Sequence, residues 1–148
     1  MAIDLSPDDA DAYNNLAAIL LDRGELTEAE VNFRRARELN PDDTDIKFNL
    51  GLILLQRGNF VEARSCFEVV VEARPEDADA HHNLAMAWRR ESGKEAAAAA
   101  LASFRRAVEI DGDNCDSLLE LAVLLREEGC LTDALATSER VLMTDSED

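Results

Sequence analysis

Apolar residues recur three and four positions apart over much of the chain, which is the spacing of one buried stripe on an α-helix. A first stripe falls at Tyr13, Leu16, Ala17, Leu20 and Leu21. A second stripe follows at Ala29, Phe33, Ala36 and Leu39. Between them stands Gly24, a residue common just past helix ends, and Pro41 stops the second helix because it has no N–H to donate. The stretch is therefore predicted to be two amphipathic helices joined by a tight turn.

The two-helix pattern returns along the whole chain, with a period of 34 residues. The stretch that begins at Asp11 is repeated from Asp45, from Asp79 and from Asp116. The third copy carries three extra residues, which are expected to lengthen its second helix by almost one turn. We therefore predict an all-α fold with residues 1–9 as the end of a preceding repeat helix, followed by four repeats at 10–43, 44–77, 78–114 and 115–148.

The last repeat weakens toward its end, because Ser138 stands where the other three repeats have a phenylalanine. A terminal repeat faces water on one side, so the loss of a buried aromatic residue is expected there. The starts of the second helices show Ser/Thr/Asn followed by Glu, a pattern typical of a capping box, in which each side chain bonds a backbone N–H. The predicted capping residues are Thr27 with Glu30, Asn59 with Glu62, Ser92 with Glu95, and Thr132.

Self-similarity at this period, with two helices in each period, resembles the tetratricopeptide repeat. The first repeat carries the resemblance most fully, at Tyr13, Leu16, Ala17, Leu20, Gly24, Ala29, Phe33, Ala36 and Pro41. The chain departs from the pattern at Lys47, where a large aromatic residue is usual, and at Gly112, where a proline is usual. The resemblance implies antiparallel helix pairs coiled into a right-handed superhelix, whose first helices line a concave groove. It also implies a protein that binds peptides or other proteins and has no catalytic activity.

The charge of the chain narrows the kinds of partner. With 32 acidic and 15 basic residues among 148, the formal net charge is −17. Nucleic acid is disfavoured, because its binding depends on Lys and Arg neutralising phosphates. No segment approaches the roughly 18 apolar residues of a membrane span, so membrane insertion is not expected. Three scattered cysteines fit free thiols in a reducing compartment, which favours a cytoplasmic protein.

Candidate binding residues follow from the groove positions that the resemblance implies. They are Asn14, Asn15, Phe48, Asn49, Leu52, His82, Asn83, Met86, Arg89, Arg90 and Arg126. An asparagine amide both donates and accepts, so the row formed by Asn15, Asn49 and Asn83 could pair with a peptide backbone. Two alternatives stay open: the asparagines bond neighbouring helices, and the arginines form surface ion pairs with Glu91, Glu127 and Glu128.

Motifs of catalysis and of cofactor binding are missing from the sequence. It contains neither a phosphate-binding loop nor a dinucleotide fingerprint. His81 and His82 are adjacent and point in different directions on a helix, so they cannot share a metal. We therefore predict a non-enzymatic interaction scaffold without cofactors, binding a peptide or protein of unknown identity. Alternatives are a self-assembly module that forms homo-oligomers through repeat ends or the convex face, and the regulatory segment of an enzyme such as a glycosyltransferase.

Overall fold

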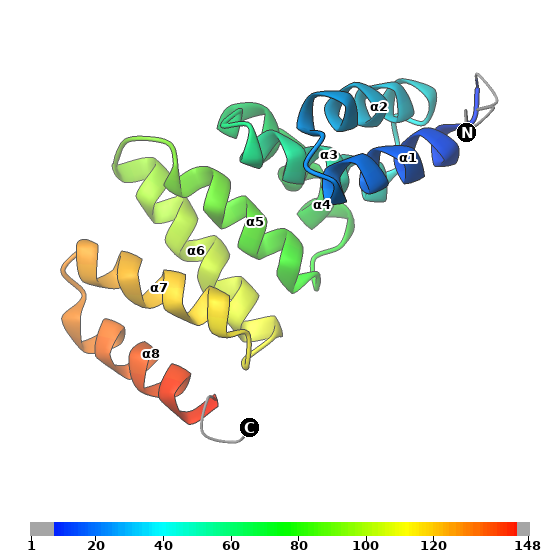
Figure 1. The fold of residues 1–148 in the computed structure, drawn as a ribbon. Helices are drawn as coiled ribbons and strands as arrows, with labels where there is room; N and C mark the ends of the chain where they lie inside the picture. Colours follow the sequence, from blue (N-terminus) through cyan, green and yellow to red (C-terminus); the bar gives the residue numbers. More distant parts are fainter. Residues whose placement is uncertain (1–7, 145–148) are drawn as a thin grey trace. The chain divides into compact units, whose positions relative to one another are not determined.

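The computed structural model describes residues 8–144, and within that range the regular secondary structure consists of eight α-helices joined by short turns (Figure 1). In chain order they are α1 (Ala10–Asp22), α2 (Leu26–Leu39), α3 (Thr44–Gln56), α4 (Phe60–Ala73), α5 (Ala78–Arg89), α6 (Lys94–Ile110), α7 (Cys115–Glu127) and α8 (Leu131–Thr144). The predicted all-α repeat fold is therefore confirmed. The expectation that residues 1–9 end a preceding helix falls almost entirely outside the described residues.

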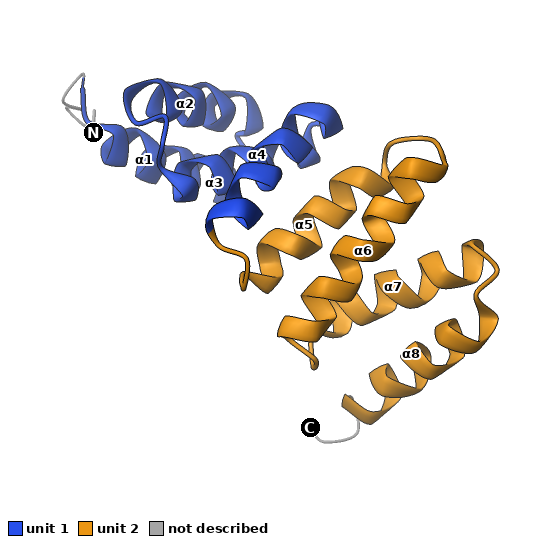
Figure 2. Ribbon diagram, turned by 180° about the vertical axis from the view of Figure 1, so that it is seen from behind, with its two compact units in different colours: residues 1–73 blue, residues 74–148 orange. Residues whose placement is uncertain are grey.

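The chain forms two compact units, residues 1–73 and 74–148 (Figure 2). In unit 1, α1 packs against α2, α3 packs against α4, and α2 contacts α3. Phe33 and Phe67, at equivalent positions of the two pairs, are fully buried. A Cβ atom on Gly51 would lie 2.7 Å from the Phe67 ring, so this glycine allows α3 and α4 to approach closely.

In unit 2, α5 packs against α6, α6 contacts α7, and α7 packs against α8. The core is built around Phe104, with Leu118, Leu121 and Leu125 from α7. Helix α6 has 17 residues, whereas α2, α4 and α8 have 14 each. The run of five alanines lies in its first half, and Ala96 and Ala100 turn inward to the buried side.

Three glycines end the first helices of their pairs with a positive φ angle. Gly24, Gly58 and Gly129 have φ between +76° and +80°, the left-handed region that favours glycine. The residue after Gly24, Glu25, donates its N–H to the Leu20 carbonyl at 2.9 Å. The chain thus reverses at a single residue, and α2 begins at Leu26.

The predicted helix caps are wrong at Thr27, Ser92 and Thr132. The N-cap residue of α2 is Glu25 and that of α6 is Gly93, and neither makes a side-chain cap hydrogen bond. Helices α2 and α8 begin at Leu26 and Leu131, so Thr27 and Thr132 already lie inside them, whereas α6 begins only at Lys94, one residue later than a cap at Ser92 requires. Side-chain caps occur at the first helices instead, where the N-cap residues Asp9, Asp43, Asp77 and Asn114 accept backbone N–H groups.

Candidate binding surface

Two asparagines of unit 1 face each other across neighbouring first helices. Asn49 of α3 donates from Nδ2 to Oδ1 of Asn14 of α1 over 3.1 Å, and both side chains are half-buried. Asn15, the member of the predicted row on α1, is exposed. The hydrogen bond to a neighbouring helix, left open as an alternative, is therefore present at Asn49, and it pairs this residue with Asn14 from the adjacent row.

The apolar candidates of unit 1 lie on α3 beside Asn49. The Phe48 ring stands edge-on to the Phe67 ring, with centroids 5.7 Å apart and an interplanar angle of 75°. Phe48 and Leu52 are both half-buried. Phe48 thus supports the packing of α3 on α4 while part of its ring remains accessible to solvent.

In unit 2, His82 and Asn83 of α5 are both engaged within the unit. His82 Nδ1 lies 2.8 Å from Oγ of Ser117 on α7, a fully buried hydroxyl, and its ring is edge-on to Phe104 at 5.6 Å. Burial lowers the pKa of His82, although the nearby carboxylates of Asp116 and Asp79 act in the opposite direction. Asn83 donates to the carbonyl of Asp79 in its own helix at 2.8 Å.

The arginine candidates of unit 2 differ in their surroundings. Arg89 forms ion pairs with Glu120 of α7 and, at 3.5 Å, with Glu127. The pair with Glu127 is one of the surface ion pairs left open by the sequence, whereas Glu120 is an additional partner. Arg89, Met86, Arg90 and Glu120 line one pocket of about 330 Å³. These four residues are therefore brought together, and Arg126 lies apart from them.

Arg126 lines a second pocket, of about 440 Å³, between α7 and α8. This pocket is mostly apolar and is lined by Leu119, Ala122, Val123, Arg126, Leu131, Ala134, Leu135 and Ser138. Sequence reasoning missed it, because it treated α8 only as a weakened repeat helix. The available signal was Ser138, since a small side chain at a position that otherwise holds phenylalanine leaves space beside its neighbours.

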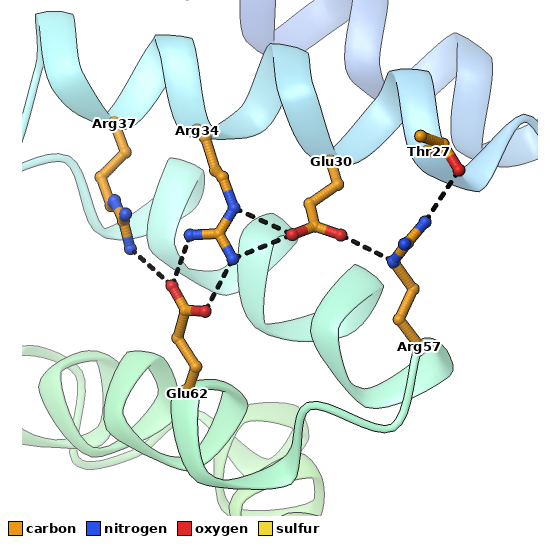
Figure 3. A network of polar contacts seen from close by, with 6 residues as sticks. All are labelled: Thr27, Glu30, Arg34, Arg37, Arg57 and Glu62. Carbon is orange, nitrogen blue, oxygen red and sulfur yellow. Dashed lines mark hydrogen bonds and ion pairs between the residues drawn. The ribbon is translucent and has the colours of Figure 1, made fainter.

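A network of charged residues joins three helices of unit 1 (Figure 3). The Glu62 carboxylate of α4 accepts from both terminal nitrogens of Arg34 of α2, at 2.6 and 2.7 Å, and from Arg37 at 3.3 Å. Glu30 binds Arg34 at 2.9 Å and Arg57, at the end of α3, at 2.7 Å. The bonds from Arg34 and Arg37 hold the pKa of Glu62 below its usual value. The network therefore links α2 to both helices of the second pair.

Residues capable of metal or redox chemistry are dispersed. Within residues 8–144, no group of three His, Cys, Asp or Glu side chains is placed to hold a metal ion. Cys66 is buried, Cys115 is half-buried and Cys130 is exposed, and none of the three is paired with another cysteine in residues 8–144. None of the eight described helices is long and apolar enough to cross a membrane.

Comparison with known proteins identifies the repeat. Two family models, both described as tetratricopeptide repeat, match residues 20–87 and 1–31. None of the curated proteins searched matches the chain. A solved structure of MamA from Desulfovibrio magneticus RS-1 superposes with a TM-score of 0.88 at 20% identity, covering 95% of this chain and 78% of that one. Another MamA structure has a TM-score of 0.88 at 13% identity, covering 96% and 81%.

A third solved structure is more similar in sequence. YrrB, whose structure is described as a TPR protein with an unusual peptide-binding site, has a TM-score of 0.82 at 26% identity, and the alignment covers 95% of this chain and 71% of that chain. The family models, the helix pairs and these neighbours agree. The chain belongs to the tetratricopeptide repeat family, whose members are scaffolds for protein–protein interaction.

Proposed function

We propose that this protein is a non-catalytic, cytoplasmic scaffold that binds an extended peptide or protein segment on the first helices of its repeats. The observation that carries the proposal is the pair of asparagine amides, Asn14 and Asn49, on neighbouring first helices of unit 1. Asparagine costs some tenths of a kcal/mol against alanine inside a helix, so two facing asparagines need a compensating role. Their mutual bond supplies part of that role and leaves further hydrogen-bonding capacity.

That remaining capacity matches a peptide backbone. Asn49 uses one of its two N–H groups on Asn14 and keeps its carbonyl oxygen, while Asn14 keeps both of its N–H groups. The mutual bond fixes the orientation of both amides before a ligand arrives, which reduces the entropy lost on binding. Phe48 and Leu52, half-buried on the same helix as Asn49, supply apolar contact area beside them.

Unit 2 offers different chemistry for the same kind of ligand. Its pocket of about 330 Å³ combines the adaptable Met86 side chain with Arg89, Arg90 and Glu120. Because Arg89 is already paired with Glu120, a ligand carboxylate would have to displace that partner. A neutral or basic peptide avoids this competition and also suits the net charge of −17. YrrB, at 26% identity, supports a peptide as the ligand class.

A displayed library of random peptides, screened against the full chain, tests the proposal. The strongest hit, labelled with a fluorophore, is titrated by fluorescence anisotropy against the wild type and against Asn49→Ala. Loss of one or two hydrogen bonds should weaken binding about two- to tenfold per bond. The predicted groove residues Asn15→Ala and Asn83→Ala are measured in parallel.

The matched control is Asn32→Ala on α2. Asn32 donates to the carbonyl of Glu28 four residues earlier at 2.8 Å, as Asn83 does to Asp79, but it lies on a second helix. Its removal should leave the affinity unchanged. Equal affinity of wild type and Asn49→Ala would remove the asparagine pair from the binding site, and a library without any binder would count against peptide binding itself.

A further inference from the structure

Among residues 8–144, two apolar faces are more exposed than the equivalent faces elsewhere in the fold. On α8, Leu131, Leu135 and Leu142 are 67%, 64% and 70% exposed. On α1, Ile19 is 46% exposed. Leu131 and Leu135 also line the pocket of about 440 Å³ between α7 and α8. The repeat gives each of these positions an equivalent whose surroundings are known.

The equivalents of the α1 face are buried. Ile46 and Ile53 of α3 stand 34 positions after Ala12 and Ile19, and they are 1% and 0% exposed. They belong to a first helix that packs beside the preceding pair, because α3 contacts both α2 and α1. The face of α1 that carries Ala12 and Ile19 is therefore of the kind that this fold buries against a preceding helix pair.

The equivalents of the α8 face are covered in the same way. Leu101 and Val108 of α6 correspond to Leu135 and Leu142 of α8, and they pack with the core of unit 2, where α6 contacts α7. Val108 is 6% exposed, whereas Leu142 is 70% exposed. The face of α7 and α8 is thus of the kind that this fold covers with the first helix of another pair.

We propose that the α7/α8 face binds α1 of a second copy of this chain, head to tail. In this contact, α1 of the second copy packs against α7 and α8 in the same way as α7 packs against α5 and α6 within one copy. Ile19 then occupies the position equivalent to Leu124, which is 4% exposed in its own unit. The apolar pocket between α7 and α8 receives that side chain.

Charge complementarity favours a second copy as the occupant. Between α5 and α7, Arg89 pairs with Glu127. In the proposed contact, the position of Arg89 is taken by Arg126 on α7, and the position of Glu127 is taken by Asp22 at the end of α1 of the second copy. Arg126 lines the pocket and is exposed, and Asp22 is exposed as well. The head-to-tail contact thus reproduces an ion pair that the fold already uses.

A polar contact lies beside this ion pair, and an apolar contact replaces it in the proposed interface. Between α5 and α7, His82 bonds Ser117. The equivalent residues in the proposed contact are Leu119 and Ala12, so an apolar pair takes the place of a polar one. Leu119 is 50% exposed and would be covered by the contact. A contact that joins two different faces repeats from copy to copy, so it builds chains or rings.

Sedimentation velocity of the full chain over a wide concentration range tests the proposal. Salt of roughly 0.15 M limits the long-range repulsion between acidic copies to a Debye length of about 8 Å. The average mass should rise with concentration beyond that of a dimer. Leu135→Asp and Ile19→Asp, one on each face, should each weaken association roughly tenfold or more. Val31→Asp on α2, also an exposed apolar position at 63%, should have no effect.

Exchanging the two charges of the proposed ion pair tests whether α1 of a second copy binds at this face. Arg126→Asp and Asp22→Arg should each weaken association, and the double variant should restore it, because the ion pair is re-formed with reversed sign. Circular dichroism confirms that each variant is folded. A chain that remains monomeric at every concentration would overturn the proposal. So would association that is lost in Leu135→Asp but unchanged in Ile19→Asp and Asp22→Arg, since a different surface would then cover α7 and α8.

Discussion

Replacing Glu62 by glutamine tests how strongly the charged network of unit 1 stabilises the fold. Glutamine keeps the size of the side chain and removes its charge. In the native structure the Glu62 carboxylate accepts from Arg34 at 2.6 and 2.7 Å and from Arg37 at 3.3 Å. Arg34 keeps Glu30 as a partner in the variant, so it is not left unpaired. The change therefore measures the link between α2 and α4.

The magnitude follows from geometry and exposure. A hydrogen bond to a charged group contributes about 1.5–3 kcal/mol where it is shielded from water, and an exposed ion pair contributes about 0–1 kcal/mol. The side chains of Arg34 and Glu62 are 33% and 36% exposed, so their pair lies between these limits. We expect Glu62→Gln to lower the free energy of unfolding by about 1–1.5 kcal/mol, which lowers Tm by about 2–5 °C in a chain of this length.

Urea unfolding followed by circular dichroism at 222 nm measures this free energy. Glu38→Gln is the matched control, because Glu38 pairs with Arg35 of its own helix and is 64% exposed. The control should change the free energy by less than about 0.5 kcal/mol. A loss for Glu62→Gln no larger than that of the control would refute the reasoning that the two-nitrogen contact between helices outweighs solvent screening.

The pH dependence adds a second check on the same residue. The pKa of Glu62 is lowered in the folded protein, so its contribution is present above the ordinary glutamate value of 4.5 and is lost as pH falls through the folded value. The difference between wild type and Glu62→Gln should therefore be constant from pH 7 to about pH 5.5 and should shrink below the pH range where glutamate titrates. A difference that persists in strong acid would show that the effect is steric.

Two further outcomes depend on single buried groups. Burial lowers the pKa of His82, so the unfolded chain binds a proton more readily than the folded one. The stability of the wild type should therefore fall as pH drops below about 6.5. Unfolding curves should show a smaller loss for His82→Gln. Burial also raises the pKa of the Cys66 thiol, so mass spectrometry should show a thiol reagent labelling the exposed Cys130 first and Cys66 only in urea; rapid labelling of native Cys66 would contradict the buried position.

Much of the fold could be predicted because its strongest signals are local. A glycine with positive φ and an apolar stripe each determine structure within a few residues, and such patterns recur from one repeat to the next. The residues at which the second helices begin were harder to predict. Thr27 was expected to cap α2, but the N-cap residue is Glu25, and a side-chain cap is found at Asp9 of α1 instead. The turn at Gly24 accounts for the difference, because it starts α2 before Thr27 can act as its cap.

The candidate site was harder to predict, because contacts between neighbouring helices depend on how far one helix is shifted along the other. Residues of the same row were expected to act together, yet Asn49 bonds Asn14 from the adjacent row. Arg89 forms ion pairs with Glu120 and Glu127 of the neighbouring first helix. Repeat positions assigned to binding therefore also join one pair to the next. Glu120 illustrates the consequence: it occupies the asparagine row in the last repeat, and there its partner is an arginine. A substitution at Asn49 or Arg89 removes a contact between neighbouring helix pairs, so stability must be measured on the same variants before a loss of binding is assigned to the proposed groove.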